Sequence, residues 1–315
     1  MAEAINPYHY KNGFHSTETI GIWGAAAAAA QLWGLNLEAT RHALGIAGSK
    51  SAGIRVAFGT MTKPHHAGAA AEGGVVAAKL AGMGYRTDPD ALDGPWEFFQ
   101  VSGSGVDREF IHGRLGNPFS FVSPGVSIKP YPCRSLSHPS MDSMLDLILE
   151  HDVQPESIDS IRLGTTSNIL AALRYHEPMN ELEAKFSIPF CLAVLGLYRR
   201  GGIAQFTDQV VLHPEVRQMM GRVIAYLHED LEAQGFQRIR SLLEITLRDG
   251  TVLTKTAETS RGTPDRPMTS DELAEKFMDC SQGILSSAAA DECLDLIMGL
   301  EEISHIDRLT GLLCG

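Results

Sequence analysis

The sequence predicts an α+β protein in which a discontinuous all-helical domain carries an inserted α+β lid domain. The first block of the chain is rich in alanine and glycine, with apolar residues at helical spacing. The middle block mixes helical patterns with alternating, strand-like runs. The last block is helical again. We therefore predict a helical domain of residues 1–128 and 257–315 and a lid domain of residues 129–256.

Residues 16–83 are predicted to form closely packed helices. The run TETIGIWGAAAAAAQLWG predicts a helix ending at Gly34, and Asn36 is a suitable N-cap for the next helix. A third helix, HAGAAAEGGVVAAKLAGMG, is predicted to end at Gly82 and Gly84. Because small residues let helices approach one another, this block predicts a bundle core. Residues 88–128 predict loops.

The middle and last blocks contain signals for particular elements. Residues 138–152 predict an amphipathic helix that begins at Pro139, and SIDSIRLGTT alternates as a strand does. A hairpin is predicted where Asp249-Gly250 separates two alternating runs. Two further helices are predicted, EAKFSIPFCLAVLGLYRRGG and one that runs into a strand in HPEVRQMMGRVIAYLHED. Thr269 and Glu272 predict a capping box at the start of the last block.

Composition excludes several classes of protein. The 315 residues have a formal net charge of -12 and no block of Lys or Arg, which argues against a nucleic-acid partner. No apolar run reaches the roughly 20 residues that span a bilayer, and the first residues lack signal-peptide features. The five cysteines are scattered without a CxxC pair, so we expect a cytoplasmic protein whose thiols are reduced and mostly buried. No metal site is predicted, because none of the twelve histidines shows ligand spacing with a carboxylate partner.

Two stretches of the first block concentrate polar groups among small residues. His15 precedes a predicted helix start, where Ser16 and Thr17 are possible caps and free N–H groups favour anions. In TKPHHAG, Pro64 is predicted to begin the helix that contains His66, with Lys63 at its N-terminal mouth. The helix dipole disfavours a charged lysine there, so Lys63 suits a proton acceptor or an anion clamp. The alternatives are a packed histidine and an ordinary surface lysine.

Two stretches of the middle block are further candidates. Lys129, Arg134 and His138 lie within ten residues on a proline-stiffened loop ahead of a helix, which suits a carboxylate receptor. Lys185 and Ser187 lie near the start of an apolar helix. In both cases the alternative is ordinary polar decoration of a loop or helix end. No GxSxG, Walker A, GxGxxG or HExxH motif occurs.

Five stretches taken together resemble the MmgE/PrpD family, which includes 2-methylcitrate dehydratase, cis-aconitate decarboxylase and iminodisuccinate epimerase. These stretches are GFHSTETIGIWGAAAAAAQLWGL, TKPHHAGAAAEGGVVAAKLAGMGY, KPYPCRSLSHP, EAKFSIPF and RGTPDRPMTSDELAEKF. The resemblance implies a split helical domain with an inserted lid domain. It also implies an enzyme that needs no cofactor, acts on small di- or tricarboxylates and is usually a homodimer.

By motif match, the resemblance places His15, Lys63, His66 and His138 on positions that line the family's cleft. Lys129 and Arg134 lie on the loop that carries His138. The chain departs from the family pattern in two ways. Members usually begin with a helical segment bearing a HALDFDD-like motif, whereas this sequence starts at MAEAINPYHYKNGFH. Decarboxylase-like members carry a tyrosine after the FS pair, where this chain has Phe190.

The leading hypothesis is a hydro-lyase that dehydrates a β-hydroxy polycarboxylate such as 2-methylcitrate, a reaction of propionate metabolism. Lys63, Lys129 and Arg134 would hold carboxylates, and His138 would serve as acid or base with His15 or His66 as its counterpart. One alternative is an epimerase or decarboxylase of a small di- or tricarboxylate. Another is a truncated or split-gene chain that is inactive until a partner supplies the N-terminal helices.

Overall fold

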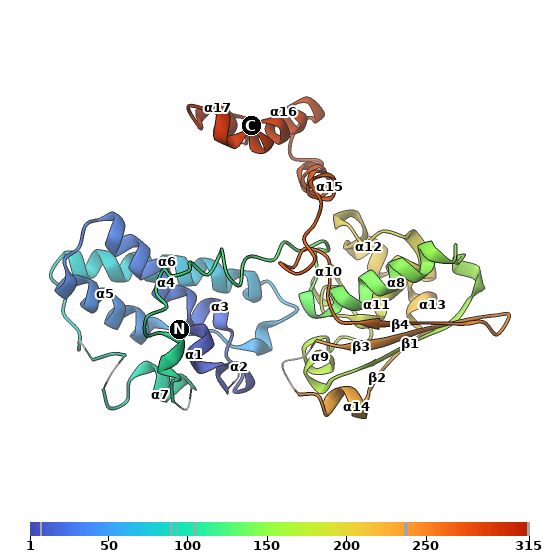
Figure 1. Ribbon diagram of the computed structural model, residues 1–315, viewed down its shortest axis with the longest axis horizontal. Helices are drawn as coiled ribbons and strands as arrows, with labels where there is room; N and C mark the ends of the chain where they lie inside the picture. Colours follow the sequence, from blue (N-terminus) through green and yellow to red (C-terminus); the bar gives the residue numbers. More distant parts are fainter. Residues whose placement is uncertain (7, 89, 93, 104, 236–238, 314–315) are drawn as a thin grey trace. The chain divides into compact units, whose positions relative to one another are not determined.

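The computed structural model describes residues 1–315 except 7, 89, 93, 104, 236–238 and 314–315 (Figure 1). The chain divides into two compact units, unit 1 (Met1–Ser123) and unit 2 (Pro124–Gly315). Unit 1 is helical, and unit 2 combines helices with a four-stranded sheet, so the α+β class is confirmed. The structure groups the last helices of the chain with unit 2. That they rejoin the first helical block stays a prediction.

Unit 1 is built on three long helices, α4 (Gly21–Leu32), α5 (Leu37–Lys50) and α6 (Thr62–Gly82). Asn36 caps α5 as predicted, since its Oδ1 accepts from the Ala39 N–H at 2.9 Å. Gly74 of α6 lies so close to α4 that an added Cβ would come within 2.6 Å of the Ala26 nitrogen. The small residues therefore do permit close helix packing. The remaining helices are α1 (Ala2–Ile5), α2 (Tyr8–Lys11), α3 (Ser16–Thr19) and α7 (Phe98–Gly103).

The start of the first predicted helix is different in the structure. The chain forms a short α3 and then α4, separated at Ile20. The predicted caps Ser16 and Thr17 are wrong, because the extended backbone at His15 puts that residue, rather than either of them, in the N-cap position. Similarly, α6 begins two residues before Pro64, which the first turn of a helix tolerates because its N–H groups have no partner there.

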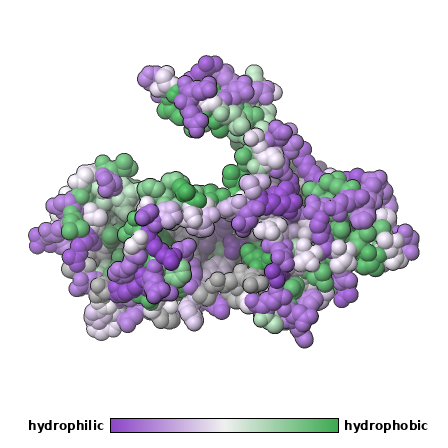
Figure 2. Space-filling model, in the orientation of Figure 1, coloured by the Kyte–Doolittle hydropathy of each residue, from purple (hydrophilic) through white to green (hydrophobic). Residues whose placement is uncertain are grey.

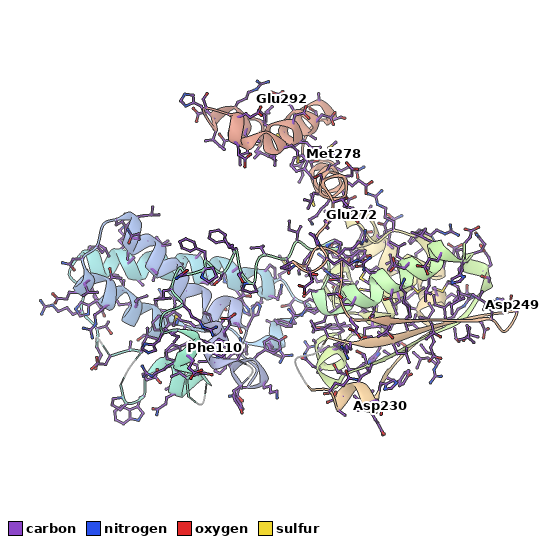
Figure 3. All side chains as sticks on the ribbon, viewed as in Figure 1. Phe110, Asp230, Asp249, Glu272, Met278 and Glu292 are labelled. Atoms are coloured by element: carbon purple, nitrogen blue, oxygen red, sulfur yellow. The ribbon has the colours of Figure 1, made fainter. Side chains whose placement is uncertain are left out.

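Unit 2 contains a sheet of order β2-β1-β3-β4. Strand β1 (Ile158–Thr165) pairs in parallel with β2 (Val223–Leu227) and antiparallel with β3 (Ser241–Leu247), and β3 pairs antiparallel with β4 (Val252–Ala257). The predicted hairpin is confirmed. Its tip is Asp249 (Figure 3), whose Oδ1 accepts from the Thr251 N–H at 2.9 Å.

Three helices supply most of the helical side of the unit 2 core. These are α8 (His138–Glu150), α11 (Ile188–Tyr198) and α13 (Pro214–Met220). Their apolar side chains pack with inward residues of β1 and β3, such as Ile161 and Ile245. Shorter helices complete the layer, namely α9 (Ser167–Ala172), α10 (Glu181–Ala184), α12 (Asp208–Val211) and α14 (Glu229–Glu232). This core fixes the orientation of α8, whose N-terminal residue is His138.

The C-terminal part of unit 2 is helical, with α15 (Ser270–Ser281), α16 (Ser287–Met298) and α17 (Asp307–Leu313). The predicted capping box is confirmed, because Thr269 Oγ1 accepts from the Glu272 N–H and the Thr269 N–H donates to Glu272 Oε2. Figure 2 shows apolar surface among the polar side chains of this part, where Met298 and Leu300 are exposed.

Three expectations from composition can be compared with the described residues. Cys133, Cys191 and Cys293 are buried free thiols and Cys280 is exposed, whereas Cys314 lies outside the described residues. Among the helices that the structure describes, none has the length and apolar character needed to cross a bilayer. The described side chains also include no group of three or more His, Cys, Asp or Glu placed to hold a metal ion.

Candidate active site

Within unit 1, α3 and α6 bring two of the predicted site residues together. His15 Nδ1 lies 2.7 Å from His66 Nδ1, and both residues are only 5% exposed. The His15 and Phe58 rings also make an edge-to-face contact, with their centroids 5.0 Å apart. We call these two residues the imidazole pair. Two rings in contact through nitrogen atoms, and shielded from water, can pass a proton between them.

The carboxylate of Glu18 lies close to the imidazole pair. Glu18 Oε2 lies 3.4 Å from His66 Nε2, and the Glu18 side chain is largely buried. Gly53 leaves room for it, because a Cβ at that position would be 2.4 Å from Glu18 Oε2. The sequence reasoning missed Glu18. Its position three residues after His15, on the first turn of the same helical segment, was the available signal.

The backbone that carries His15 is also fixed. The His15 N–H donates to the Gly53 carbonyl at 3.0 Å. His9 is fully buried. Its Nδ1–H donates to the Ser102 carbonyl, and its Nε2 lies 2.7 Å from Thr19 Oγ1. Burial lowers the pKa of His9, which therefore favours a neutral ring that accepts from the Thr19 hydroxyl.

Lys63 lies in the first turn of α6, one turn before His66. Its backbone N–H donates to the Thr60 carbonyl at 3.2 Å, and it is half-buried. Of the two histidines in TKPHHAG, His66 is buried and His65 is exposed. That Lys63 contacts a substrate stays a prediction.

Unit 2 contains a cavity of about 340 Å³ that the residues of two loops and the start of α8 enclose. We call it the unit 2 cavity. Its ionisable lining includes Lys129, His138, Arg261, Glu258 and Asp265. Five residues with hydroxyl side chains also line it, namely Ser127, Ser135, Thr259, Ser260 and Thr263. Its volume is within the usual range for small-molecule sites, and its donors suit carboxylate oxygens.

Lys129 and His138 converge on one carbonyl group. Lys129 Nζ donates to the Cys133 carbonyl oxygen at 3.2 Å, and His138 Nε2 lies 3.3 Å from the same atom. Because a carbonyl oxygen only accepts, His138 Nε2 carries a hydrogen and the neutral ring has its lone pair on Nδ1. Partial burial lowers the pKa of the Lys129 ammonium, although interaction with Cys133 opposes this and Arg134 and Lys276 add to it.

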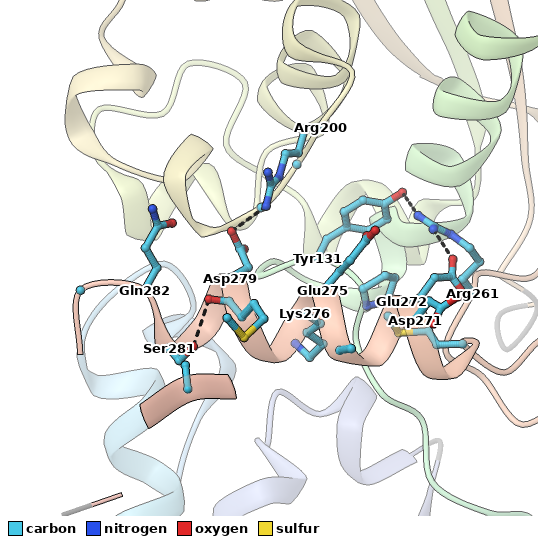
Figure 4. Close-up of a pocket in the computed structure, with 18 of the residues that line it drawn as sticks. Tyr131, Arg200, Arg261, Asp271, Glu272, Glu275, Lys276, Asp279, Ser281 and Gln282 are labelled. Carbon is cyan, nitrogen blue, oxygen red and sulfur yellow. Dashed lines mark hydrogen bonds and ion pairs between the residues drawn. The ribbon is translucent and has the colours of Figure 1, made fainter. Parts of the chain in front are cut away.

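Arg261, which the sequence reasoning did not single out, bonds to several residues around the cavity. Asp142 of α8 is almost fully buried and accepts from the Arg261 N–H at 2.6 Å and from Arg261 Nε at 3.1 Å. The same guanidinium donates to Tyr131 Oη and to Glu272 Oε1 of α15 (Figure 4). Burial alone would lower the pKa of the Arg261 guanidinium, but its partners Tyr131, Asp142 and Glu272 raise that pKa overall. Burial and the neighbouring Asp142 raise the pKa of the Tyr131 hydroxyl.

The loop around Gly262 closes tightly on the segment before Lys129. The Ile128 N–H donates to the Gly262 carbonyl at 2.7 Å, and Gly262 has a φ of +80°. A Cβ at Gly262 would lie 1.8 Å from the Ile128 carbonyl oxygen. Only glycine satisfies both the conformation and the close approach. The position of Lys129 therefore depends on the loop that Arg261 anchors.

The other predicted residues have mainly structural contacts in what the structure describes. The Arg134 N–H donates to the Lys185 carbonyl at 3.0 Å, and Lys185 Nζ lies 3.6 Å from Glu181. Ser187 is fully buried, and its Oγ caps α11 by accepting from the Phe190 N–H at 3.2 Å. Contact of these residues with a substrate stays a prediction.

Comparison with known protein families assigns both parts of the chain. The model of the MmgE/PrpD N-terminal domain matches residues 1–111, and that of the MmgE/PrpD C-terminal domain matches residues 131–302. The two matches cover most of the chain, so the protein belongs to the MmgE/PrpD family. The predicted resemblance is thereby confirmed.

Curated relatives narrow the comparison. The chain is 26% identical to cis-aconitate decarboxylase of Homo sapiens over 310 residues, which is 96% of this chain and 63% of that protein. It is 27% identical to the enzyme of the same name from Mus musculus and 25% identical to that of Aspergillus terreus, again over 96% of this chain. The chain thus spans less than two thirds of the length of these relatives, 62% and 65% in the last two cases.

Proposed function

We propose that the protein is a lyase that acts on a small di- or tricarboxylate by acid–base chemistry. The observation that carries the proposal is the unit 2 cavity, where Lys129 and His138 donate to one carbonyl within a pocket rich in hydroxyl groups. An ammonium group and several hydroxyls suit carboxylate binding, and a neutral imidazole suits proton transfer. Membership of the MmgE/PrpD family and the names of the relatives support the same class.

The proposed chemistry divides the work between binding and proton transfer. Within unit 2, Lys129 and Arg134 neutralise carboxylates of the substrate, which lowers the cost of developing negative charge at the adjacent carbon. His138 transfers the proton, either as the base that removes it from that carbon or as the acid that protonates the leaving oxygen. We propose that this needs no cofactor and, following the family resemblance, that the working form is a homodimer.

Two reactions fit this scheme. Dehydration of a β-hydroxy tricarboxylate such as 2-methylcitrate breaks a C–H bond and a C–O bond, and it uses both an acid and a base. Decarboxylation of cis-aconitate is the second candidate, and the names of the human, mouse and fungal relatives favour it. The departure at Phe190 does not separate them, because that ring is fully buried against Phe206.

The experiment is a direct assay of the purified chain with 2-methylcitrate, citrate, cis-aconitate and an aminated dicarboxylate. Formation of an unsaturated acid from 2-methylcitrate supports dehydration, and release of carbon dioxide from cis-aconitate supports decarboxylation. Inversion of the aminated dicarboxylate without loss of a group would support an epimerase instead. A folded chain that transforms none of the four would contradict the proposal.

Lys63→Ala provides a test of the binding role in unit 1. Removing a charged partner of a carboxylate costs about 1.5–3 kcal/mol, so we expect kcat/KM to fall by at least tenfold. The melting temperature should change little, because the side chain is half-buried at the helix start. Lys79→Ala, an exposed change in the last turn of the same helix, is the control. A large loss of stability with normal kinetics would make Lys63 a structural residue.

A further inference from the structure

Asp142 is an almost fully buried acid of α8, four residues after His138. Its Oδ1 accepts from the Tyr131 hydroxyl at 2.6 Å and from Arg261 Nε at 3.1 Å. Its Oδ2 accepts from the Arg261 backbone N–H at 2.6 Å, and Arg266 Nη1 lies 3.7 Å from the same oxygen. One buried carboxylate therefore joins two segments that are far apart in the sequence, one around residue 131 and one around residue 261.

The contact with Tyr131 fixes the chain on one side of Lys129. Tyr131 follows Lys129 by two residues and is buried, and its hydroxyl also accepts from Arg261 Nη2 at 3.0 Å (Figure 4). The Tyr131 and His138 rings make an edge-to-face contact, with their centroids 5.4 Å apart. Asp142 therefore fixes the start of the segment that leads from Lys129 to His138.

The contact with Arg261 fixes the chain on the other side of Lys129. The next residue, Gly262, accepts at its carbonyl from the Ile128 N–H at 2.7 Å. Because Asp142 bonds both the backbone and the side chain of Arg261, this loop cannot shift along the cavity wall without breaking both bonds. The residue before Lys129 is thus anchored to the same carboxylate as the residues after it.

We propose that Asp142 is a positioning residue that holds the Lys129 ammonium in place beside the His138 imidazole. The two groups meet at the Cys133 carbonyl oxygen, which lies 3.2 Å from Lys129 Nζ and 3.3 Å from His138 Nε2. Since Asp142 is on the helix that begins at His138, it links the position of the ammonium to that of the ring. The inference rests on the proposed function, because it assigns what keeps the carboxylate-binding group next to the proton-transfer group.

The contacts require a carboxylate rather than an amide. Asparagine has nearly the same shape, but its NH₂ group only donates. In the place of Oδ1 that group would face the Arg261 Nε–H, and in the place of Oδ2 it would face the Arg261 backbone N–H. Either orientation leaves a donor of Arg261 without its acceptor, so Asp142→Asn weakens the anchor of the loop without removing volume.

The first experiment observes the Cys133 carbonyl, the acceptor that Lys129 and His138 share. Cys133-Arg134 is the only Cys-Arg pair in the sequence. Isotopic labelling of the cysteine carbonyl carbon and the arginine nitrogen therefore gives one carbonyl signal in an NMR spectrum of the full chain that correlates the two atoms. Lys129→Met removes one donor and records how the signal moves when that hydrogen bond is lost. We expect Asp142→Asn to move the signal in the same direction.

Asp146→Asn is the matched control, because it makes the same change on the same helix in an acid whose partner is Lys255, at 2.9 Å. It should leave the carbonyl signal where it is. An unmoved signal in a folded Asp142→Asn variant would overturn the proposal. An equal movement in both variants would also overturn it, because the effect would then belong to α8 in general.

The second experiment measures steady-state kinetics with the carboxylate that the chain transforms. We expect Asp142→Asn to raise KM about tenfold, the effect of losing one charge-assisted hydrogen bond to the substrate. Its kcat should change less than its KM, since His138 keeps its own contact with the Cys133 carbonyl. Asp146→Asn should change neither. A normal KM, or a fall in kcat without a rise in KM, would overturn the proposal.

The two experiments separate this inference from the proposed function. The carbonyl signal needs no turnover, so the expected movement in a chain that transforms no carboxylate would sustain the role of Asp142 and contradict the lyase. Turnover with an unmoved signal would contradict the role of Asp142 alone. If Asp142→Asn does not fold, Tyr131→Phe decides, because it removes only the hydroxyl that Asp142 binds. Movement toward the Lys129→Met position would support the proposal, and an unmoved signal would overturn it.

Discussion

His138 uses one ring nitrogen, Nε2, in a structural contact, and its neutral ring has the lone pair on the other nitrogen, Nδ1. Its Nε2–H donates to the Cys133 carbonyl, the acceptor that it shares with Lys129 Nζ. The ring edge meets Tyr131 at a centroid distance of 5.4 Å, and the residue is 2% exposed. A ring held in this way keeps its Nδ1 lone pair pointing in a fixed direction, which is what a general base or acid needs.

His138→Gln tests this division. Glutamine retains an N–H donor for the Cys133 carbonyl but has no basic nitrogen. We expect kcat to fall by about 10²–10⁴-fold, the usual contribution of a general acid or base, while the melting temperature stays close to that of the unsubstituted protein. His151→Gln, an exposed change at the end of the same helix, is the control. A normal kcat in this variant would show that His138 takes no part in the reaction.

At the scale of the element, Gly262 tests the loop that encloses the unit 2 cavity. Gly262→Ala places a Cβ 1.8 Å from the Ile128 carbonyl, in a backbone with a φ of +80°. Gly283→Ala is a matched control, because Gly283 has a φ of +78° and nothing within 4 Å of an added Cβ. The control should show only the left-handed backbone cost, about 1–2 kcal/mol.

Gly262→Ala should show that backbone cost and a further penalty of about 1–3 kcal/mol for overpacking. It should also raise KM, since the loop must move away from the segment that carries Lys129. Denaturant unfolding and steady-state kinetics measure the two effects. Equal unfolding free energies for the two variants would mean that the loop relaxes without cost.

The docking of α15 predicts a dependence on pH. The Thr269 N–H and then Arg261 lower the pKa of Glu272 below its ordinary value of 4.5. Between 4.5 and that lower value the unfolded chain binds more protons than the folded chain, so stability falls as pH falls through this window. The contribution is complete above the window and is lost below it.

Glu272→Gln removes this contribution. The melting temperature of the unsubstituted protein should exceed that of the variant near pH 6, and the difference should shrink as the pH is lowered to about 3. Glu275→Gln, an exposed change on the same helix, should leave the pH dependence unaltered. A difference that grows on acidification would have the opposite sign and would refute the role of Glu272.

What the sequence could predict at this scale depends on whether the signal is local. The Asp249-Gly250 hairpin and the Thr269–Glu272 box are confirmed because each is a contact between residues a few positions apart. By contrast, the Asp142–Arg261 contact joins residues 119 positions apart, and no local sequence pattern around either residue predicts it. The caps at Ser16 and Thr17 were wrong because the extended backbone at His15, whose N–H donates to the distant Gly53 carbonyl, makes His15 the N-cap of α3.

The candidate site divides in the same way. His15, Lys63, His66, Lys129 and His138 were predicted because titratable groups among small or proline-rich residues are conspicuous. The partners that tune them were missed, namely Glu18, Arg261 and Gly262, because their roles arise only from tertiary contacts. Composition and spacing therefore indicate candidate residues, whereas the partners of those residues and the loop geometry require coordinates.

At the scale of the whole molecule, each unit contains its own hydrophobic core. In unit 1 the core includes Ile22 and Trp23, and in unit 2 it includes Ile148 and Phe190. A large-to-small change in either core removes contacts within that core and costs about 2–5 kcal/mol. We therefore expect Ile22→Ala and Ile148→Ala to destabilise different parts of the chain. Scanning calorimetry of the full chain should show two heat-absorption peaks, of which each variant lowers one. A single peak that both variants shift equally would mean that the chain unfolds as one cooperative body.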